Sequence, residues 1–248
     1  MALARRGPRP VTVHRHVSVP EPSTPSPTHS HTLDRGLRAL EVLAKHPDGL
    51  SVSELAAALG THRAAVYRLL GPLGDHHLIR REPDGRFTLA PGLIELAAGV
   101  RPRLHDVAEP VLQRLADRLR ATTALTIRDG DEAVVATVIL PREPSMHLTY
   151  RPGMRHPLTQ GCPGHVLLAA MPPQSDEPPF VTRARAQQYA VSRGELLPGA
   201  TGVAAAIAAP GHEPDASISA VWIEGLDPDV VAADIIAAAR EIATALWG

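Results

Sequence analysis

Residues 50–70 have the sequence LSVSELAAALGTHRAAVYRLL, which predicts two short helices around a tight turn. Ser53 is expected to cap the first helix and Thr61 the second, because a hydroxyl accepts a hydrogen bond from an unpaired backbone amide. Gly60 fits the left-handed conformation that ends a helix. Apolar residues recur at helical spacing in both halves. This pattern indicates a helix-turn-helix, whose second helix enters the major groove of DNA.

The outward face of the second helix carries the side chains that would contact DNA. Arg63 can pair bidentately with guanine or with a phosphate, and Arg68, one turn further on, suits a phosphate. The alternative is the solvated face of an ordinary surface helix. The candidate DNA-binding residues on this face are Thr61, His62, Arg63, Tyr67 and Arg68.

A hairpin is expected directly after this motif. Residues 78–81 and 86–89 are strand-like, and Glu-Pro-Asp-Gly at 82–85 has strong turn chemistry. Arg81 and Arg86 would present positive charge to a flanking phosphate or minor groove. The alternative is a hairpin that only stabilises the helices.

Composition limits the class of protein. The chain has 248 residues, 44% of them hydrophobic, which supports one large or two modest packed domains. It has one cysteine and no long apolar run, so we expect a cytoplasmic protein without disulfides or membrane spans. Net charge is −1, but residues 1–94 contain twelve Lys and Arg against eight Asp and Glu. This distribution suits a DNA-reading head on an acidic body.

The rest of the chain divides into segments. We predict a disordered Pro/Arg-rich tail over 1–30, a winged head of three helices over 31–90, a linker helix within 91–105 and an α+β body with an antiparallel sheet over 106–248. Asp106 and Glu109 have the spacing of a capping box, and Pro72 should stop or bend the second motif helix. Within these segments, helices are expected at 33–45, 93–100, 107–120, 166–171 and 229–246, and strands at 124–127, 133–139, 146–150, 202–209 and 218–223, with a polar loop at 172–180.

The chain resembles the IclR family of bacterial transcriptional regulators. The resemblance covers about residues 31–247; it is specific in the head and looser in the body. The stretches that carry it are Leu33-Asp34-Arg35-Gly36-Leu37, Gly49-Leu50-Ser51-Val52-Ser53-Glu54-Leu55-Ala56, Val66-Tyr67-Arg68-Leu69-Leu70, Asp84-Gly85-Arg86-Phe87-Thr88-Leu89, Ala108-Glu109-Pro110-Val111-Leu112, Tyr189-Ala190-Val191-Ser192, Glu195 and Pro198-Gly199.

The resemblance implies a winged helix-turn-helix domain and a GAF-like α/β effector domain. It implies a homodimer or a dimer of dimers on a palindromic operator in double-stranded DNA, and control by a small molecule, often a carboxylate. No cofactor or metal is implied. Carried over by position, the effector pocket would involve Cys162, Pro163, Ser192, Gly202, Trp222 and Glu224.

This sequence departs from the family pattern at the expected pocket. It has Cys-Pro-Gly-His at 162–165 and a short segment between Met171 and Tyr189. Trp222 and Glu224 share one strand face, so Glu224 would oppose an anion if that face lined the pocket. We therefore hypothesise an effector that is neutral or cationic, or none. Alternatively, Glu224 lies at a solvated strand end.

Two other functions compete with a ligand-controlled regulator. The body could be a ligand-free dimerisation platform for a DNA-binding head. An enzyme would have to use Cys162 at a helix entrance with His165 close by, but an orienting group and oxyanion donors are not evident in the sequence.

Overall fold

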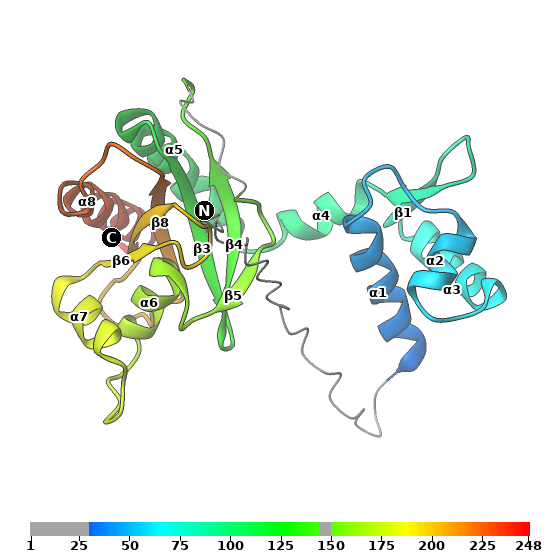
Figure 1. The fold of residues 1–248 in the computed structure, drawn as a ribbon, viewed down its shortest axis with the longest axis horizontal. Coiled ribbons are helices and arrows are strands. Elements are labelled where there is room, and N and C mark those ends of the chain that lie inside the picture. Colours follow the sequence, from blue (N-terminus) through cyan, green and yellow to red (C-terminus); the bar gives the residue numbers. More distant parts are fainter. Residues whose placement is uncertain (1–29, 144–149) are drawn as a thin grey trace, which may run out of the picture. The chain divides into compact units, whose positions relative to one another are not determined.

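The computed structural model describes residues 30–143 and 150–248, which form two compact units that meet in sequence at Ala97 and Ala98 (Figure 1). The expected tail, apart from its last residue, and the expected strand at 146–150, apart from Tyr150, lie outside the described residues. None of the described helices is long and apolar enough to cross a membrane.

The first unit is a helical bundle with a two-stranded hairpin. Its core joins the helices to the hairpin through Leu43, Leu55, Val66, Leu70 and Ile79, all of which are buried. The hairpin pairs Ile79 with Leu89 and closes the wing, as the sequence predicted. The elements are α1 His31–Ala44, α2 Val52–Ala58, α3 Arg63–Asp75, β1 Ile79–Arg81, β2 Phe87–Leu89 and α4 Gly92–Ala98.

The helix ends of this unit differ from the sequence prediction. Ser51, not Ser53, caps α2: its hydroxyl accepts from the Glu54 amide (3.3 Å), while the Glu54 carboxylate accepts from the Ser51 amide (2.8 Å). His62, not Thr61, precedes α3 and provides no side-chain cap. The predicted cap of α2 was two residues too late, and the predicted cap of α3 was one residue too early. Errors of this size are usual where several polar residues are adjacent. Pro72 does not stop α3, which continues to Asp75.

The second unit is a six-stranded antiparallel sheet with helices on both faces. The strand order is β5-β4-β3-β8-β7-β6, and the hairpin at Asp129 and Gly130 is confirmed. The strands are β3 Thr122–Asp129, β4 Glu132–Ile139, β5 Arg155–Pro157, β6 Ala190–Arg193, β7 Thr201–Ala206 and β8 Ala216–Trp222. The helices are α5 Pro102–Leu119, α6 Gly161–Ala170, α7 Pro179–Gln187 and α8 Pro228–Trp247.

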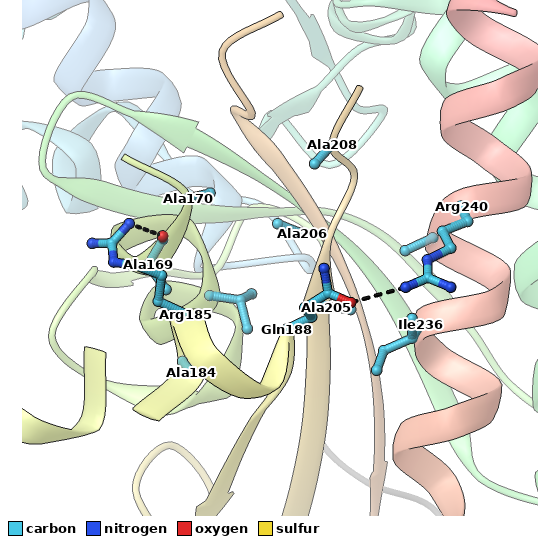
Figure 2. Close-up of a pocket in the computed structure, with 12 residues that line it drawn as sticks. Ala169, Ala170, Ala184, Arg185, Gln188, Ala205, Ala206, Ala208, Ile236 and Arg240 are labelled. Carbon is cyan, nitrogen blue, oxygen red and sulfur yellow. Dashed lines mark hydrogen bonds between the residues drawn. The ribbon is translucent and has the colours of Figure 1, made fainter. Parts of the chain in front are cut away.

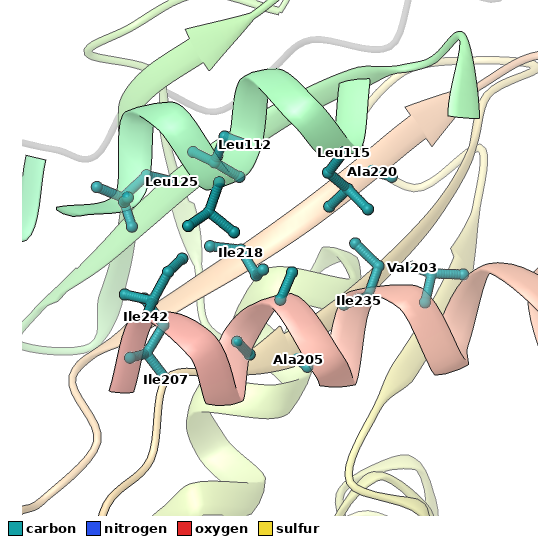
Figure 3. Packing of buried hydrophobic residues seen from close by; sticks show 14 of the residues in the cluster. Leu112, Leu115, Leu125, Val203, Ala205, Ile207, Ile218, Ala220, Ile235 and Ile242 are labelled. Atoms are coloured by element: carbon teal, nitrogen blue, oxygen red, sulfur yellow. The ribbon is translucent and has the colours of Figure 1, made fainter. Parts of the chain in front are cut away.

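The main core of this unit lies between the sheet and the pair α5 and α8 (Figure 3). Leu112 of α5, Ile235 of α8 and Ile218 of β8 are completely buried there. Because side chains alternate along a strand, the neighbours of Ile218 on β8 face the other side of the sheet, which α6 covers. The sheet is therefore buried on both faces, and a small cavity lies under α6.

Two helices of the second unit start elsewhere than expected. α5 begins at Pro102, so Asp106 and Glu109 lie inside the helix and form no capping box, and Pro110 is accommodated in its interior. α6 begins at Gly161, so the predicted entrance forms its first turn. The expected polar loop at 172–180 ends in the start of α7 at Pro179.

Candidate nucleic-acid interface and ligand cavity

The turn between α2 and α3 is held by its own backbone. Gly60 adopts φ +59°, and the Thr61 amide donates to the Ala56 carbonyl at 2.9 Å. The inward face of α3 is anchored by Val66, Leu69 and Leu70, all buried, as their helical spacing predicted. These anchors fix the opposite face of α3 toward solvent.

Four of the five DNA-binding residues predicted from the motif have exposed side chains on that opposite face. His62, Arg63, Tyr67 and Arg68 are exposed, Tyr67 by 60%, whereas Thr61 is half-buried. Within the described part of the chain, the side chains of Arg63 and Arg68 form no hydrogen bond or ion pair that would occupy them. A surface that leaves two guanidinium groups unpaired at the start of a helix is suited to phosphate and guanine contacts.

The two wing arginines have different surroundings. Arg81 is exposed at the end of β1. Arg86 instead donates from Nη1 to the Gly49 carbonyl (2.8 Å) and the Glu54 carboxylate (3.1 Å), so it ties the hairpin to α2. Arg86 is thus already paired with a carboxylate of the same unit, and its contact with DNA stays a prediction. Hydrogen bonds from Ser51 lower the pKa of the Glu54 carboxyl, and the positive charge of Arg86 lowers it further.

The cavity in the second unit lies where the N-terminus of α6 covers a row of residues across three strands. Ser192 of β6 pairs with Gly202 of β7, and Gly202 pairs with Val221 of β8. Cys162 and Pro163 of α6 lie above this row and line the same cavity. The structure therefore brings together four of the six predicted pocket residues.

Both first amides of α6 are already bonded by side chains from the β6–β7 segment. The Gly161 amide donates to the Glu195 carboxylate at 2.8 Å, and the Cys162 amide donates to the Ser192 hydroxyl at 3.0 Å. The cavity has a free volume of about 20 Å³, which is room for about one water molecule. A larger ligand needs the surrounding loop to move.

Cys162 has the environment of a structural thiol. It is buried, and a Cβ built on Gly202 would lie 2.9 Å from its Sγ, so glycine is required for this close approach. Burial raises the pKa of Cys162 to about 12, which keeps the thiol neutral. The nearby His165 bonds through Nε2 to the Thr159 carbonyl (3.1 Å) and lies 3.5 Å from Glu195. These contacts give no nucleophile–base pair.

Trp222 and Glu224 do not line this cavity, which corrects the sequence prediction. Trp222 points into the main core between the sheet and α5 and α8, because it alternates with Val221 on β8. Glu224 lies beyond the end of β8 and is exposed. The two residues share no strand face, because β8 ends at Trp222, and the exposure of Glu224 agrees with the alternative of a solvated strand end.

Two cavity residues with polar side chains, Glu195 and Tyr150, were not predicted as pocket residues from the sequence. Glu195 was noted only for its order in the chain, and its reach to α6 depends on the fold of the loop at 194–200. Tyr150 lines the cavity and is only 6% exposed. The sequence placed Tyr150 only as the last residue of a strand at 146–150, and that prediction carries no signal of a cavity position.

A second hollow of the same unit lies between α6, α7, β7 and α8 (Figure 2). It has a volume of about 220 Å³ and is walled largely by alanines. Arg185 caps the end of α6 by donating to the Met171 carbonyl at 2.6 Å, and Arg240 donates to the Gln188 side chain at 2.8 Å. No predicted site residue lines this hollow. Among the described residues, no group of His, Cys, Asp and Glu could hold a metal ion.

Comparison with known proteins identifies both units. Residues 32–83 match the family described as IclR helix-turn-helix domain, and residues 98–179 match the bacterial transcriptional regulator IclR C-terminal family. Among curated proteins, the chain is 34% identical over 141 residues to the HTH-type transcriptional regulator Rv1719 of Mycobacterium tuberculosis. It is 29% identical over 142 residues to the HTH-type transcriptional regulator TtgV of Pseudomonas putida. These alignments cover 56% and 57% of this chain and 54% of each relative, so the chain spans about half the length of the relatives it matches.

Solved structures share the fold of the chain. An IclR homologue from Microbacterium hydrocarbonoxydans, crystallised with 4-hydroxybenzoate, has a TM-score of 0.76. Its identity is 23%, and the match covers 87% of this chain and 98% of the homologue. The Thermotoga maritima IclR has a TM-score of 0.72 and 23% identity over 88% of this chain and 99% of its own. At this identity the similarity establishes the architecture of the two units.

Proposed function

Because this chain belongs to the IclR family of bacterial transcriptional regulators, we propose that it binds specific double-stranded DNA and regulates transcription in the cytoplasm, at the nucleoid. The observation that carries the proposal is the outer face of α3, where Arg63 and Arg68 are exposed beside Tyr67. In a helix-turn-helix, residues at the start of the second helix meet base edges, and the rest of its face contacts phosphates.

The proposed division of labour follows the two units. Residues 31–90 would form the DNA-binding domain, 91–105 the linker and 106–248 the effector-binding and oligomerisation domain. A homodimer, or a dimer of dimers, would place two α3 helices in successive major grooves of a palindromic operator. No cofactor or catalytic step is part of this function.

Control by a small effector is the finer part of the proposal. The cavity under α6 supports it, since Cys162, Pro163, Ser192 and Gly202 converge there. A ligand that binds one subunit arrangement better than another would change the spacing of the α3 helices and so the affinity for the operator. The small free volume supports the second candidate, a ligand-free dimerisation domain, which calls for a direct test.

The DNA proposal is tested by selecting fragments of the native genome with the purified full chain and sequencing them. We expect enrichment of a palindromic sequence. Arg63→Ala should weaken binding to that sequence by roughly 1–3 kcal/mol and relax one base preference. Failure to retain any promoter fragment at low salt would refute the proposal, and equal loss on operator and scrambled duplex would refute the base-reading role of Arg63.

Effector binding is tested by thermal denaturation of the full chain with a library of metabolites. A ligand that binds only the native state raises the melting temperature, and the stabilisation grows with the logarithm of its concentration once that exceeds Kd. A stabilising compound that also shifts operator affinity would support control by an effector. Absence of any such compound would favour the ligand-free dimerisation domain.

A further inference from the structure

The cavity under α6 has few polar groups left for a ligand. The α6 N-terminus would ordinarily attract an anion through its first amides. Here the Gly161 amide bonds to Glu195 and the Cys162 amide bonds to Ser192. A ligand carboxylate would therefore have to displace a carboxylate that the chain itself provides.

The charge in the cavity wall also disfavours an anion. None of the described residues that line it is a lysine or an arginine, and Glu195 is among them. Like charges in a partly buried site repel each other more strongly than in water. His165 contacts Glu195 but does not line the cavity. An anionic ligand would thus meet repulsion without a compensating cation.

One hydroxyl in this cavity lacks a partner. Tyr150 is only 6% exposed, and its Oη forms no hydrogen bond to any described residue. The Thr126 hydroxyl, which also has no hydrogen-bond partner there, lies near enough to lower the pKa of the phenol but does not complete a bond. Buried polar groups are nearly always paired, so an unpaired one that lines a cavity indicates a missing partner. Burial raises the pKa of the Tyr150 phenol, so the group stays protonated and can donate.

The remaining wall of the cavity is apolar. Pro163, Leu196, Leu197, Ala200 and Val221 provide it. Leu196 and Leu197 belong to a loop that runs between Gly194 and Gly199, two glycines with positive φ, and the Gly194 amide donates to the Ala200 carbonyl at 2.8 Å. The two leucines form part of the cavity wall on the loop side, so their displacement would enlarge it beyond one water molecule.

We infer that this cavity selects small uncharged molecules that have an apolar body and one hydroxyl or carbonyl oxygen, with that oxygen bonded to Tyr150 Oη. The inference rests on the proposed effector function and specifies its ligand class. Glu195 acts as the element that rejects carboxylates, in place of the role first given to Glu224. The apolar body of the ligand takes the place of Leu196 and Leu197 against Val221.

Matched probe pairs test the inference on the full-length wild type. p-Cresol and 4-hydroxybenzoate share a phenol ring and differ in a methyl group against a carboxylate; butanone and propionate form a smaller pair of the same kind. We expect the neutral member of at least one pair to bind at least about tenfold more tightly than the carboxylate. The amide chemical shifts of Gly161 and Cys162 measure the binding. Equal or tighter binding of the carboxylate, or no binding by either neutral probe, would overturn the inference.

Two variants show which residues select the ligand. Tyr150→Phe should weaken binding of the neutral probe about fivefold to tenfold and leave the melting temperature unchanged or higher, since the lost hydroxyl makes no hydrogen bond to a described residue. Tyr189→Phe is the matched control, because its hydroxyl bonds to Asp229 and does not line this cavity. Glu195→Gln should reduce the preference for the neutral probe. An equal effect of both tyrosine variants, or an unchanged preference in Glu195→Gln, would contradict the assignment.

The outcome is separable from that of the proposed DNA-binding function. Operator binding by α3 is measured in the absence of any probe, and the probe pairs are measured in the absence of DNA. A protein that retains its operator but takes the carboxylates fails this inference alone. A protein that binds the neutral probes but no promoter fragment fails the DNA proposal alone.

Discussion

The outer face of α3 and the cavity under α6 use polar groups in opposite ways. On α3, Arg63 and Arg68 are exposed and their guanidinium groups are not consumed by the fold. Under α6, the Gly161 and Cys162 amides are bonded within the chain, and Tyr150 Oη is a donor without a hydrogen-bond partner among residues 30–143 and 150–248. The difference indicates that the first surface is prepared for a highly charged partner and the second for an uncharged one.

The largest expected effect concerns whether the cavity is closed. Cys162 is the only cysteine, so its alkylation can be followed cleanly by mass spectrometry. Because burial raises its pKa from 9.0 to about 12, the thiolate fraction at pH 8 is about a thousandfold smaller than for an ordinary thiol. We expect iodoacetamide to react with the folded protein at least about a thousandfold more slowly than with free cysteine.

Denaturant provides the control for that measurement, since unfolding should restore the rate of free cysteine. A folded-state rate within about tenfold of free cysteine would mean that the α6 cavity opens readily. It would also remove the contrast with α3, because the cavity would then be an accessible surface as well.

The second prediction separates the stability of the two units. Ile235 of α8 is completely buried in the main core, so Ile235→Ala should cost about 2–5 kcal/mol of unfolding free energy. Val230 on the same helix is 66% exposed, and Val230→Ala is the matched control with an effect near zero. Both tryptophans lie in the second unit, so denaturation followed by tryptophan fluorescence reports on it.

If the two units fold independently, the Ile235→Ala substitution should leave the midpoint of the unfolding transition of the first unit, followed by circular dichroism, unchanged. A common shift of both transitions would show that the units unfold together. In that case an effect on DNA binding could not be attributed to α3 alone.

Sequence patterns predicted the elements of the first unit because its signals are local. The spacing of Val66, Leu69 and Leu70 and the Asp-Gly turn at 84–85 each specify their own element without help from distant residues. The cap of α2 was misplaced because Ser51 and Ser53 are equally good caps, and only the reach of Glu54 back to the Ser51 amide decides between them.

The cavity was predicted less well because its geometry is not local. Cys162 and Ser192 are thirty positions apart, and their contact needs both the sheet order and the placement of α6. The face of Trp222 could not be decided from alternation, since β8 is buried on both faces and its hydrophobicity does not alternate. Arg86 was assigned to DNA because its pairing with Glu54 crosses thirty-two positions.

The third prediction contrasts the two wing arginines. Arg81→Ala should leave the stability of the first unit unchanged and lower the salt dependence of DNA binding by about one phosphate contact. Arg86→Ala should destabilise that unit by roughly 1–2 kcal/mol, because the hydrogen bond to the Gly49 carbonyl is lost. Binding isotherms at several salt concentrations and denaturation of each variant distinguish the two roles.

The reverse result would be equally informative. An Arg86→Ala protein of unchanged stability but reduced salt dependence would restore the original assignment of Arg86 to DNA. It would then follow that Glu54 releases this arginine when DNA binds, and the wing would belong to the exposed charged surface as a whole.

The smallest effect concerns the start of α2, the helix that supports α3. Ser51→Ala should cost about 1 kcal/mol of unfolding free energy, because the Glu54 amide loses its acceptor at 3.3 Å. Ser53→Ala is the matched control: its hydroxyl makes no cap contact, and alanine has the higher helix propensity, so its effect should be near zero or slightly stabilising. Denaturation followed by circular dichroism measures both. A larger cost for Ser53→Ala would mean that α2 starts two residues later and is shorter. The turn that presents Arg63 would then be held less firmly. The exposed face of α3 would lose the rigidity on which its contrast with the closed cavity depends.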